Sequence, residues 1–185
     1  MKRVLAILCL VVFLTACSGK NEELDRAMGL RAKMLAQAVA FDTKITADYG
    51  DLTYTFSMHC QADTQGNMTF QVTGPETIAG ITGTVSKEGG KLTFDGQALA
   101  FDLMADGQIS PVSAPWVLIQ TLRGGYLTSC NMENDRLRVS IDDRYEDDAL
   151  HLEVWLQSDD QPVCAEVYWQ GRRLLTLEIA NFALN

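Results

Sequence analysis

Long stretches of this 185-residue chain alternate between apolar and polar residues, and this two-residue period constrains the fold more than any other feature. In the clearest stretch, residues 52–60, every second residue is apolar: Leu52, Tyr54, Phe56, Met58 and Cys60. Because a strand places successive side chains on opposite faces, the pattern predicts a half-buried β-strand. Strand-like segments follow at residues 68–72, 92–94, 99–103, 126–132, 136–142, 149–157, 163–170 and 172–182. The chain is therefore predicted to consist mainly of strands.

Short turns separate these segments. Residues 63–66 form one polar connection, and the pairs Asp95-Gly96 and Asp106-Gly107 form two more. Asp-Gly between alternating segments is typical of a type I′ hairpin turn. Hairpin-length connections favour antiparallel neighbours, whereas parallel strands need long crossovers. We therefore expect a largely antiparallel sheet of about ten strands that follow one another as a meander.

A first helix is predicted over about residues 22–40. Asn21 can cap it, and the acidic residues that follow place negative charge in the first turn, where the helix dipole favours it. Four apolar residues recur at helical spacing and predict the buried face: Leu24, Met28, Leu35 and Val39.

A second, short helix is predicted in the middle of the chain. Ser113 can cap it, Pro115 lies in its first turn, and the glycines at 124–125 end it. Its expected buried side carries Trp116, Ile119, and Leu122 or Leu118. With two helices and a largely antiparallel sheet, the fold class is α+β.

The first seventeen residues have the organisation of an export signal. Lys2 and Arg3 precede the apolar run of residues 4–14, and Leu14-Thr15-Ala16-Cys17 resembles the bacterial lipobox. That resemblance implies cleavage before Cys17 and a diacylglycerol on its sulfur, and two acyl chains suffice for stable anchoring. We expect a signal peptide at 1–16, a lipidated tether at 17–21 and one domain at 22–185, on the extracytoplasmic face of the cell membrane. A secreted protein cut near Thr15 or Ala16, or an uncleaved anchor, is the alternative.

Composition argues against several classes of function. The net charge is −9, and binding to nucleic acid needs clustered basic residues, so no nucleic-acid partner is expected. His59 and His151 fall on the polar faces of their strands and belong to no catalytic motif. The acidic segment 142–148 lacks the pattern of a calcium loop. We expect no enzyme activity, no metal and no cofactor.

Three cysteines fall in the predicted domain, at positions 60, 130 and 164. Their spacing contains no Cys-x-x-Cys pair, which argues against a zinc site. Three free thiols are expected, and one disulfide among them is the alternative.

Several short motifs together resemble the LolA/LolB-like superfamily of bacterial lipoproteins. They are the lipobox, the two helices among many strands, the spacing Gly66-x-x-Thr69-x-x-Val72-x-x-Pro75, and the turn Leu92-x-x-Asp95-Gly96. The arrangement also resembles small LolA-like lipoproteins of spore-forming Firmicutes, including the GerS type. The resemblance implies a strongly curved, incomplete β-barrel covered by helices over an apolar cavity. It also implies that the protein handles acyl chains or binds a protein partner. Residues 74–81 lack the arginine and tryptophan that lipoprotein carriers have in the corresponding run.

A non-enzymatic binding role follows, with an apolar ligand or acyl chain held in the concave sheet. The expected lining residues are Tyr54, Phe56, Met58, Phe70, Phe94, Phe101, Trp116, Ile78 and Ile81. Glycines surround the last two, so they form either a mobile rim of the cavity or a permanently buried bend. The alternative function is an interaction module that docks or regulates a cell-envelope enzyme and has no ligand cavity.

Overall fold

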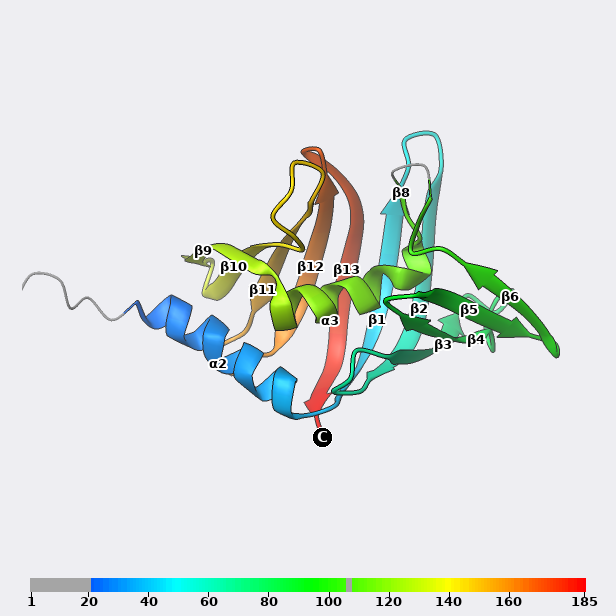
Figure 1. The fold of residues 1–185 in the computed structure, drawn as a ribbon, viewed down its shortest axis with the longest axis horizontal. Coiled ribbons are helices and arrows are strands. Elements are labelled where there is room, and N and C mark those ends of the chain that lie inside the picture. Colours follow the sequence, from blue (N-terminus) through cyan, green and yellow to red (C-terminus); the bar gives the residue numbers. More distant parts are fainter. Residues whose placement is uncertain (1–20, 106–107) are drawn as a thin grey trace, which may run out of the picture.

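One open, curved antiparallel sheet carries the fold of the computed structural model, which describes residues 21–105 and 108–185 (Figure 1). Its eleven strands are β1 (Val39–Asp48), β2 (Thr53–Ala62), β3 (Met68–Gly74), β4 (Thr82–Ser86), β5 (Gly89–Phe94), β6 (Gln97–Phe101), β9 (Tyr126–Glu133), β10 (Arg136–Asp142), β11 (Leu150–Leu156), β12 (Pro162–Trp169) and β13 (Arg172–Leu184). The short strands β7 (Met104–Ala105) and β8 (Gln108–Ile109) pair separately. The expected signal peptide, the lipidation site Cys17 and the turn at 106–107 lie outside the described residues.

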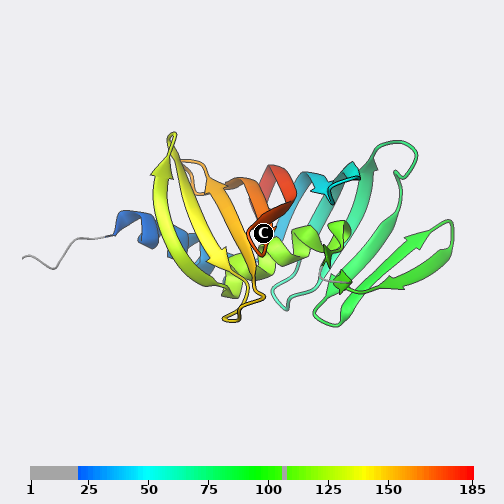
Figure 2. The same ribbon diagram turned by 90° about the horizontal axis from the view of Figure 1, so that it is seen from above.

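The strand order is β6-β5-β4-β3-β2-β1-β13-β12-β11-β10-β9. Two meanders, β1 to β6 and β9 to β13, are joined where β1 pairs with β13, from Val39 opposite Leu184 to Ala47 opposite Leu175. Strands β6 and β9 are the two ends of this sheet, so the barrel is not closed. Figure 2 shows the curvature of the sheet around α3 (Ala114–Gly124). The expected α+β fold, an incomplete barrel with two helices, is confirmed.

Two strands, β1 and β4, are missing from the predicted set. Phe41, Ile45 and Ala47 alternate with polar residues along β1, and Thr43 occupies a buried position between them. Strand β4 contains one buried apolar residue, Val85, and little else that marks it as a strand. Its pairing with β3 and β5 holds it in the sheet.

Helix α2 (Glu22–Ala36) begins as predicted, because the Asn21 side chain accepts a hydrogen bond from the Leu24 amide at 3.1 Å. The predicted end at residue 40 is wrong: Gln37 is extended, and Val39 already pairs in β1. The predicted buried face is wrong as well. Leu24, Met28 and Leu35 are 39%, 44% and 56% exposed. The helix instead buries a neighbouring stripe: Ala27, Leu30 and Met34.

Helix α3 follows the short 3-10 turn η1 (Pro111–Ser113). Leu118, Ile119 and Leu122 are buried, as the sequence predicts. The expected cap is not formed, because the Ser113 hydroxyl donates to the carbonyls of Leu103 and Ser110 instead. In both views the helix crosses the concave side of the sheet (Figures 1 and 2).

The core lies between this helix and the concave face. Its largest fully buried side chains come from both meanders, both helices and β8: Phe41, Met34, Ile45, Met58, Met68, Ile109, Leu118, Ile119, Leu137, Ile141, Leu150 and Leu152. Cys60, Cys130 and Cys164 are free, as predicted. Within residues 21–105 and 108–185, no helix has both the length and the hydropathy to span a bilayer.

Candidate functional site

The apolar face of the sheet continues outward beyond the part that α3 covers. One row of paired residues runs across four strands, from Phe70 through Gly83 and Leu92 to Leu99. Exposure rises along this row: Phe70 is 4% exposed, Leu92 is half-buried and Leu99 is 65% exposed. The β5–β6 hairpin lies beyond the beginning of α3 in both ribbon views. The sheet therefore presents apolar side chains to solvent at this end.

A groove with a volume of about 510 Å³ lies on this exposed end. Its lining residues are Ile81, Leu92, Phe94, Asp95, Gln97, Ala98 and Leu99. We call it the β5–β6 groove. The volume is in the range of small-ligand sites, and an apolar wall with a few polar groups is the usual lining of such sites. Phe94, one of these lining residues, is 53% exposed.

Two glycines shape the surface beside the groove. A Cβ atom on Gly83 would overlap the Phe70 ring, and one on Gly90 would overlap the Phe101 ring. Each aromatic ring therefore lies directly on the backbone of the adjacent strand. Phe101 and Gly90 are paired residues, so the Phe101 ring packs back onto β5. One contact thus packs β3 against β4, and the other packs β6 against β5.

The predicted type I′ turn connects β5 to β6. Asp95 and Gly96 have φ values of 48° and 73°, the left-handed conformation that this turn needs at both central positions. Phe94 and Gln97 are paired on either side of it. The turn thus places one carboxylate and one amide at the same end of the β5–β6 groove.

The nine predicted lining residues do not all meet at this groove. Ile81 and Phe94 line it. The others lie as follows: Phe56, Met58 and Phe70 are buried in the core; Phe101, Trp116 and Ile78 are half-buried; and Tyr54 is exposed. Leu99 also lines the groove, but the sequence predicts it only as a strand residue. Its place in the alternating pattern after the Asp95-Gly96 turn is the signal that could have identified it.

The predicted rim or bend, residues 75–83, is tied to the end of β3, and its last two residues begin β4. The Gly80 amide donates to the Val72 carbonyl at 2.9 Å, and the Val72 amide donates to the Ile81 carbonyl at 2.8 Å. Trp116 is held in a similar way, because its indole nitrogen donates to the Gly66 carbonyl at 2.7 Å. The start of α3 is thereby fixed against the β2–β3 turn.

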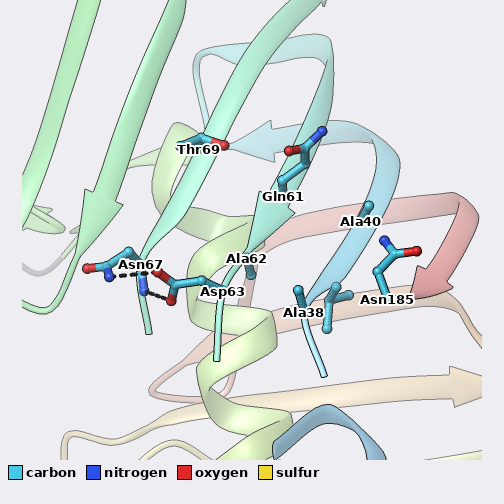
Figure 3. Close-up of a pocket in the computed structure, with 9 residues that line it drawn as sticks. Ala38, Ala40, Gln61, Ala62, Asp63, Asn67, Thr69 and Asn185 are labelled. Atoms are coloured by element: carbon cyan, nitrogen blue, oxygen red, sulfur yellow. Dashed lines mark hydrogen bonds between the residues drawn. The ribbon is translucent and has the colours of Figure 1, made fainter. Parts of the chain in front are cut away.

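A second pocket, of about 310 Å³, lies where β1 begins and β2 ends (Figure 3). Its wall is formed by small and polar residues, among them Ala40, Gln61 and Asn185. Its one charged side chain, Asp63, accepts hydrogen bonds from Asn67, and these lower the pKa of the Asp63 carboxyl. The Asp63 carboxylate thus already accepts hydrogen bonds from its own turn. The β5–β6 groove is therefore the stronger candidate site.

Polar side chains are linked on the face of the sheet opposite the core. The two ring nitrogens of His151 contact Asp142 and Glu153 at 2.7 and 3.0 Å, and the Ser140 hydroxyl donates to Glu153 at 2.8 Å. His59 contacts Asp42 at 2.7 Å. Both histidines lie on polar faces, as predicted. The serine in this network contacts a carboxylate and not an imidazole, so the arrangement is not that of a serine nucleophile with its base. In the described part of the chain, no three His, Cys, Asp or Glu side chains are arranged so that they could together hold a metal ion.

Neither a family model nor a curated protein matches this sequence. Among solved structures, a domain from Vibrio parahaemolyticus named as an outer membrane lipoprotein-sorting protein is similar at a TM-score of 0.50, with 10% identity over 90% of this chain and 94% of that one. An uncharacterized conserved protein from Thermus thermophilus gives 0.47, with 13% identity over 89% of this chain and 86% of that one. A LolA superfamily protein from Nitrosomonas europaea gives 0.44, with 14% identity over 86% and 93%. The Vibrio structure has the highest TM-score of these three, and it shows that this chain shares the fold of that domain.

Proposed function

We propose that this protein is a non-enzymatic binding protein that takes an apolar chain of a lipid or similar amphiphile into the β5–β6 groove. The observation that carries the proposal is the apolar row that leaves the covered core and ends at the exposed Leu99. A contiguous exposed apolar surface beside a groove is typical of a ligand or partner site. The lipoprotein-sorting name of the similar Vibrio domain agrees with such a role.

The proposal extends to the location of the protein. We propose a lipoprotein anchored through Cys17 on the extracytoplasmic face of the cell membrane, of the small type that the resemblance to Firmicutes proteins implies. The support is the sequence Leu14-Thr15-Ala16-Cys17 behind a basic and apolar segment. A tether of residues 17–21 reaches at most about 18 Å, so α2 would begin close to the lipid headgroups. The domain would then lie near a source of acyl chains, with the β5–β6 hairpin at the other end of the molecule from the start of α2 (Figure 1).

A second candidate function is docking of a cell-envelope protein. Strand β6 is the end of the sheet, and its sequence, Gln-Ala-Leu-Ala-Phe, contains no charged residue. Uncharged end strands are templates for pairing with another chain. Phe56, Met58 and Phe70 are buried in the filled core, which is also what the interaction-module reading expects.

Binding of a neutral fluorescent alkyl probe, pyrene-dodecanol, to the purified protein tests the first candidate. Leu99→Ser removes apolar wall from the groove and should weaken binding about tenfold, equivalent to roughly 1.4 kcal/mol of lost apolar burial. Ala100→Ser is the matched control, because Ala100 lies on the same strand and pairs with Lys91 in a row on the opposite face. It should bind the probe like the unaltered protein. Failure of the unaltered protein to bind the probe, or equal binding by both variants, would contradict a ligand role for the groove.

A further inference from the structure

The polar end of the β5–β6 groove indicates which headgroup its ligand carries. We infer that the amphiphile bound there has a positively charged headgroup, such as an alkylammonium; this inference rests on the proposed function. Asp95 is the one charged residue among those that line the groove, and it lies at the end formed by the β5–β6 turn. Gln97 adds an uncharged amide at the same end.

Asp95 is free to meet such a headgroup. It is exposed, and no basic side chain within the described residues forms a salt bridge with it. The nearest lysine in the hairpin, Lys91, belongs to a different row: it pairs with Thr84 and Ala100. Lys91 lines a separate pocket together with Glu88 and Asp102. The negative charge of Asp95 in the groove is therefore not neutralised by Lys91.

Charge favours one class of amphiphile over another. An ammonium held beside Asp95 is attracted, whereas a carboxylate, sulfate or phosphate at the same place is repelled. Because an exposed ion pair contributes less than about 1 kcal/mol, the preference attributable to Asp95 should be about two- to fivefold in affinity. The net charge of −9 acts in the same direction at low ionic strength. An anionic lipid is therefore expected to bind this groove more weakly than a cationic amphiphile of the same chain length.

The position of Asp95 allows a clean substitution. Its φ of 48° is left-handed, and asparagine tolerates this conformation as well as aspartate does. Asp95→Asn therefore removes the charge and keeps the turn. Asp102, which is exposed just beyond the other end of β6, provides the control. Asp102→Asn makes the same change in net charge and leaves the residues that line the groove unaltered.

Competition against bound pyrene-dodecanol measures the preference. Dodecyltrimethylammonium, dodecanol and dodecyl sulfate share one chain length and differ in headgroup charge. At low salt, the two ionic compounds are added below their critical micelle concentrations and dodecanol below its solubility limit. We expect the cation to displace the probe at the lowest concentration and the sulfate at the highest. The preference for the cation over the sulfate should fall about two- to fivefold in Asp95→Asn and stay unchanged in Asp102→Asn.

The outcomes separate the two proposals. Probe binding with equal displacement by cation and sulfate would overturn the headgroup inference and leave the groove as a binding site. A preference that survives Asp95→Asn, or that falls equally in Asp102→Asn, would also overturn it, because the selectivity would then come from the charge of the whole molecule. Absence of probe binding to the unaltered protein would overturn the proposed function itself, and the inference with it.

Discussion

His151 lies between two carboxylates on the face of the sheet opposite the core. Partial burial by itself would lower the pKa of the imidazole, but the hydrogen bonds to Asp142 and Glu153 outweigh it, and the pKa is raised. Tyr168 lies beside the ring, with its ring centre 6.1 Å away, and Arg138 lies 3.5 Å from the Glu153 carboxylate. The folded state therefore holds the proton more tightly than the unfolded chain. The resulting stabilisation is fully present below about pH 6.5 and is lost as the pH rises through the folded-state pKa.

Replacing His151 should consequently change the pH dependence of stability. We expect His151→Gln to lower the free energy of unfolding more at pH 5.5 than at pH 8.5, because only the protonated imidazole interacts favourably with both carboxylates. Urea unfolding at the two pH values measures this difference. Asp142→Asn should reduce the pH dependence without removing it, since Glu153 remains. An equal loss at both pH values would mean that His151 contributes through packing and not through charge.

At the scale of elements, two arginines join the ends of the covering helices. Arg31 of α2 donates to the carbonyls of Leu122 and Gly125, each at 2.8 Å, at the end of α3. Arg123 of α3 donates in return to the Met34 carbonyl at 2.9 Å, in the last turn of α2. The last carbonyls of a helix have no partner within it and carry partial negative charge, so a cation from the neighbouring helix satisfies both needs. Each helix thus stabilises the end of the other.

Arg123 should be the more sensitive of the two, because it is buried and also donates to the carbonyls of Gln37 and Asp63. We expect Arg123→Met to lower the free energy of unfolding by about 2–4 kcal/mol, since one buried carbonyl and two partly buried carbonyls lose a charged donor. Arg172→Met is the control: Arg172 is exposed and lies 3.9 Å from Asp48, so its loss should cost less than about 1 kcal/mol. Guanidinium unfolding curves for both variants would give the comparison, and similar losses would exclude the proposed role of Arg123.

Alternation in the sequence predicted most strands, and the exceptions have identifiable causes. The helical spacing of Leu35 and Val39 extended the predicted helix over the start of β1. Helix α2 carries two neighbouring apolar stripes at helical spacing, and the sequence alone does not show which of them is buried. The Arg31 contacts to α3 take part in setting how the helix packs. Leu99 alternates like a core residue, yet its exposure depends on where α3 begins, which is a property of the tertiary structure.

At the scale of the whole molecule, the two meanders differ in what covers them. Helix α2 contacts β9, and α3 contacts β2 and β10, whereas the β5–β6 hairpin extends past both helices. One end of the sheet is therefore closed and the other is open. The core therefore lies at the end of the sheet that the helices cover, and the β5–β6 groove lies at the uncovered end.

Attachment to a membrane would place this asymmetric domain beside a lipid surface. Intact-mass analysis of the protein from the membrane fraction should show an N-terminal Cys17 that carries acyl chains, and Cys17→Ala should abolish both the modification and the cleavage. Cys9→Ala is the control, because Cys9 lies inside the apolar run and its replacement should leave processing unchanged. An unmodified mature N-terminus downstream of Cys17 would rule out the anchor.

The groove and the core differ in how freely their amino-acid sequences can change. Residues that line the groove, such as Phe94 and Leu99, are more than half exposed, and exposed positions usually tolerate substitution within about 0.5 kcal/mol of stability. Core residues such as Phe41 have no such freedom. Mutations at the rim of the sheet would accordingly alter the surface of the groove without endangering folding. One architecture would thereby be compatible with many different groove surfaces.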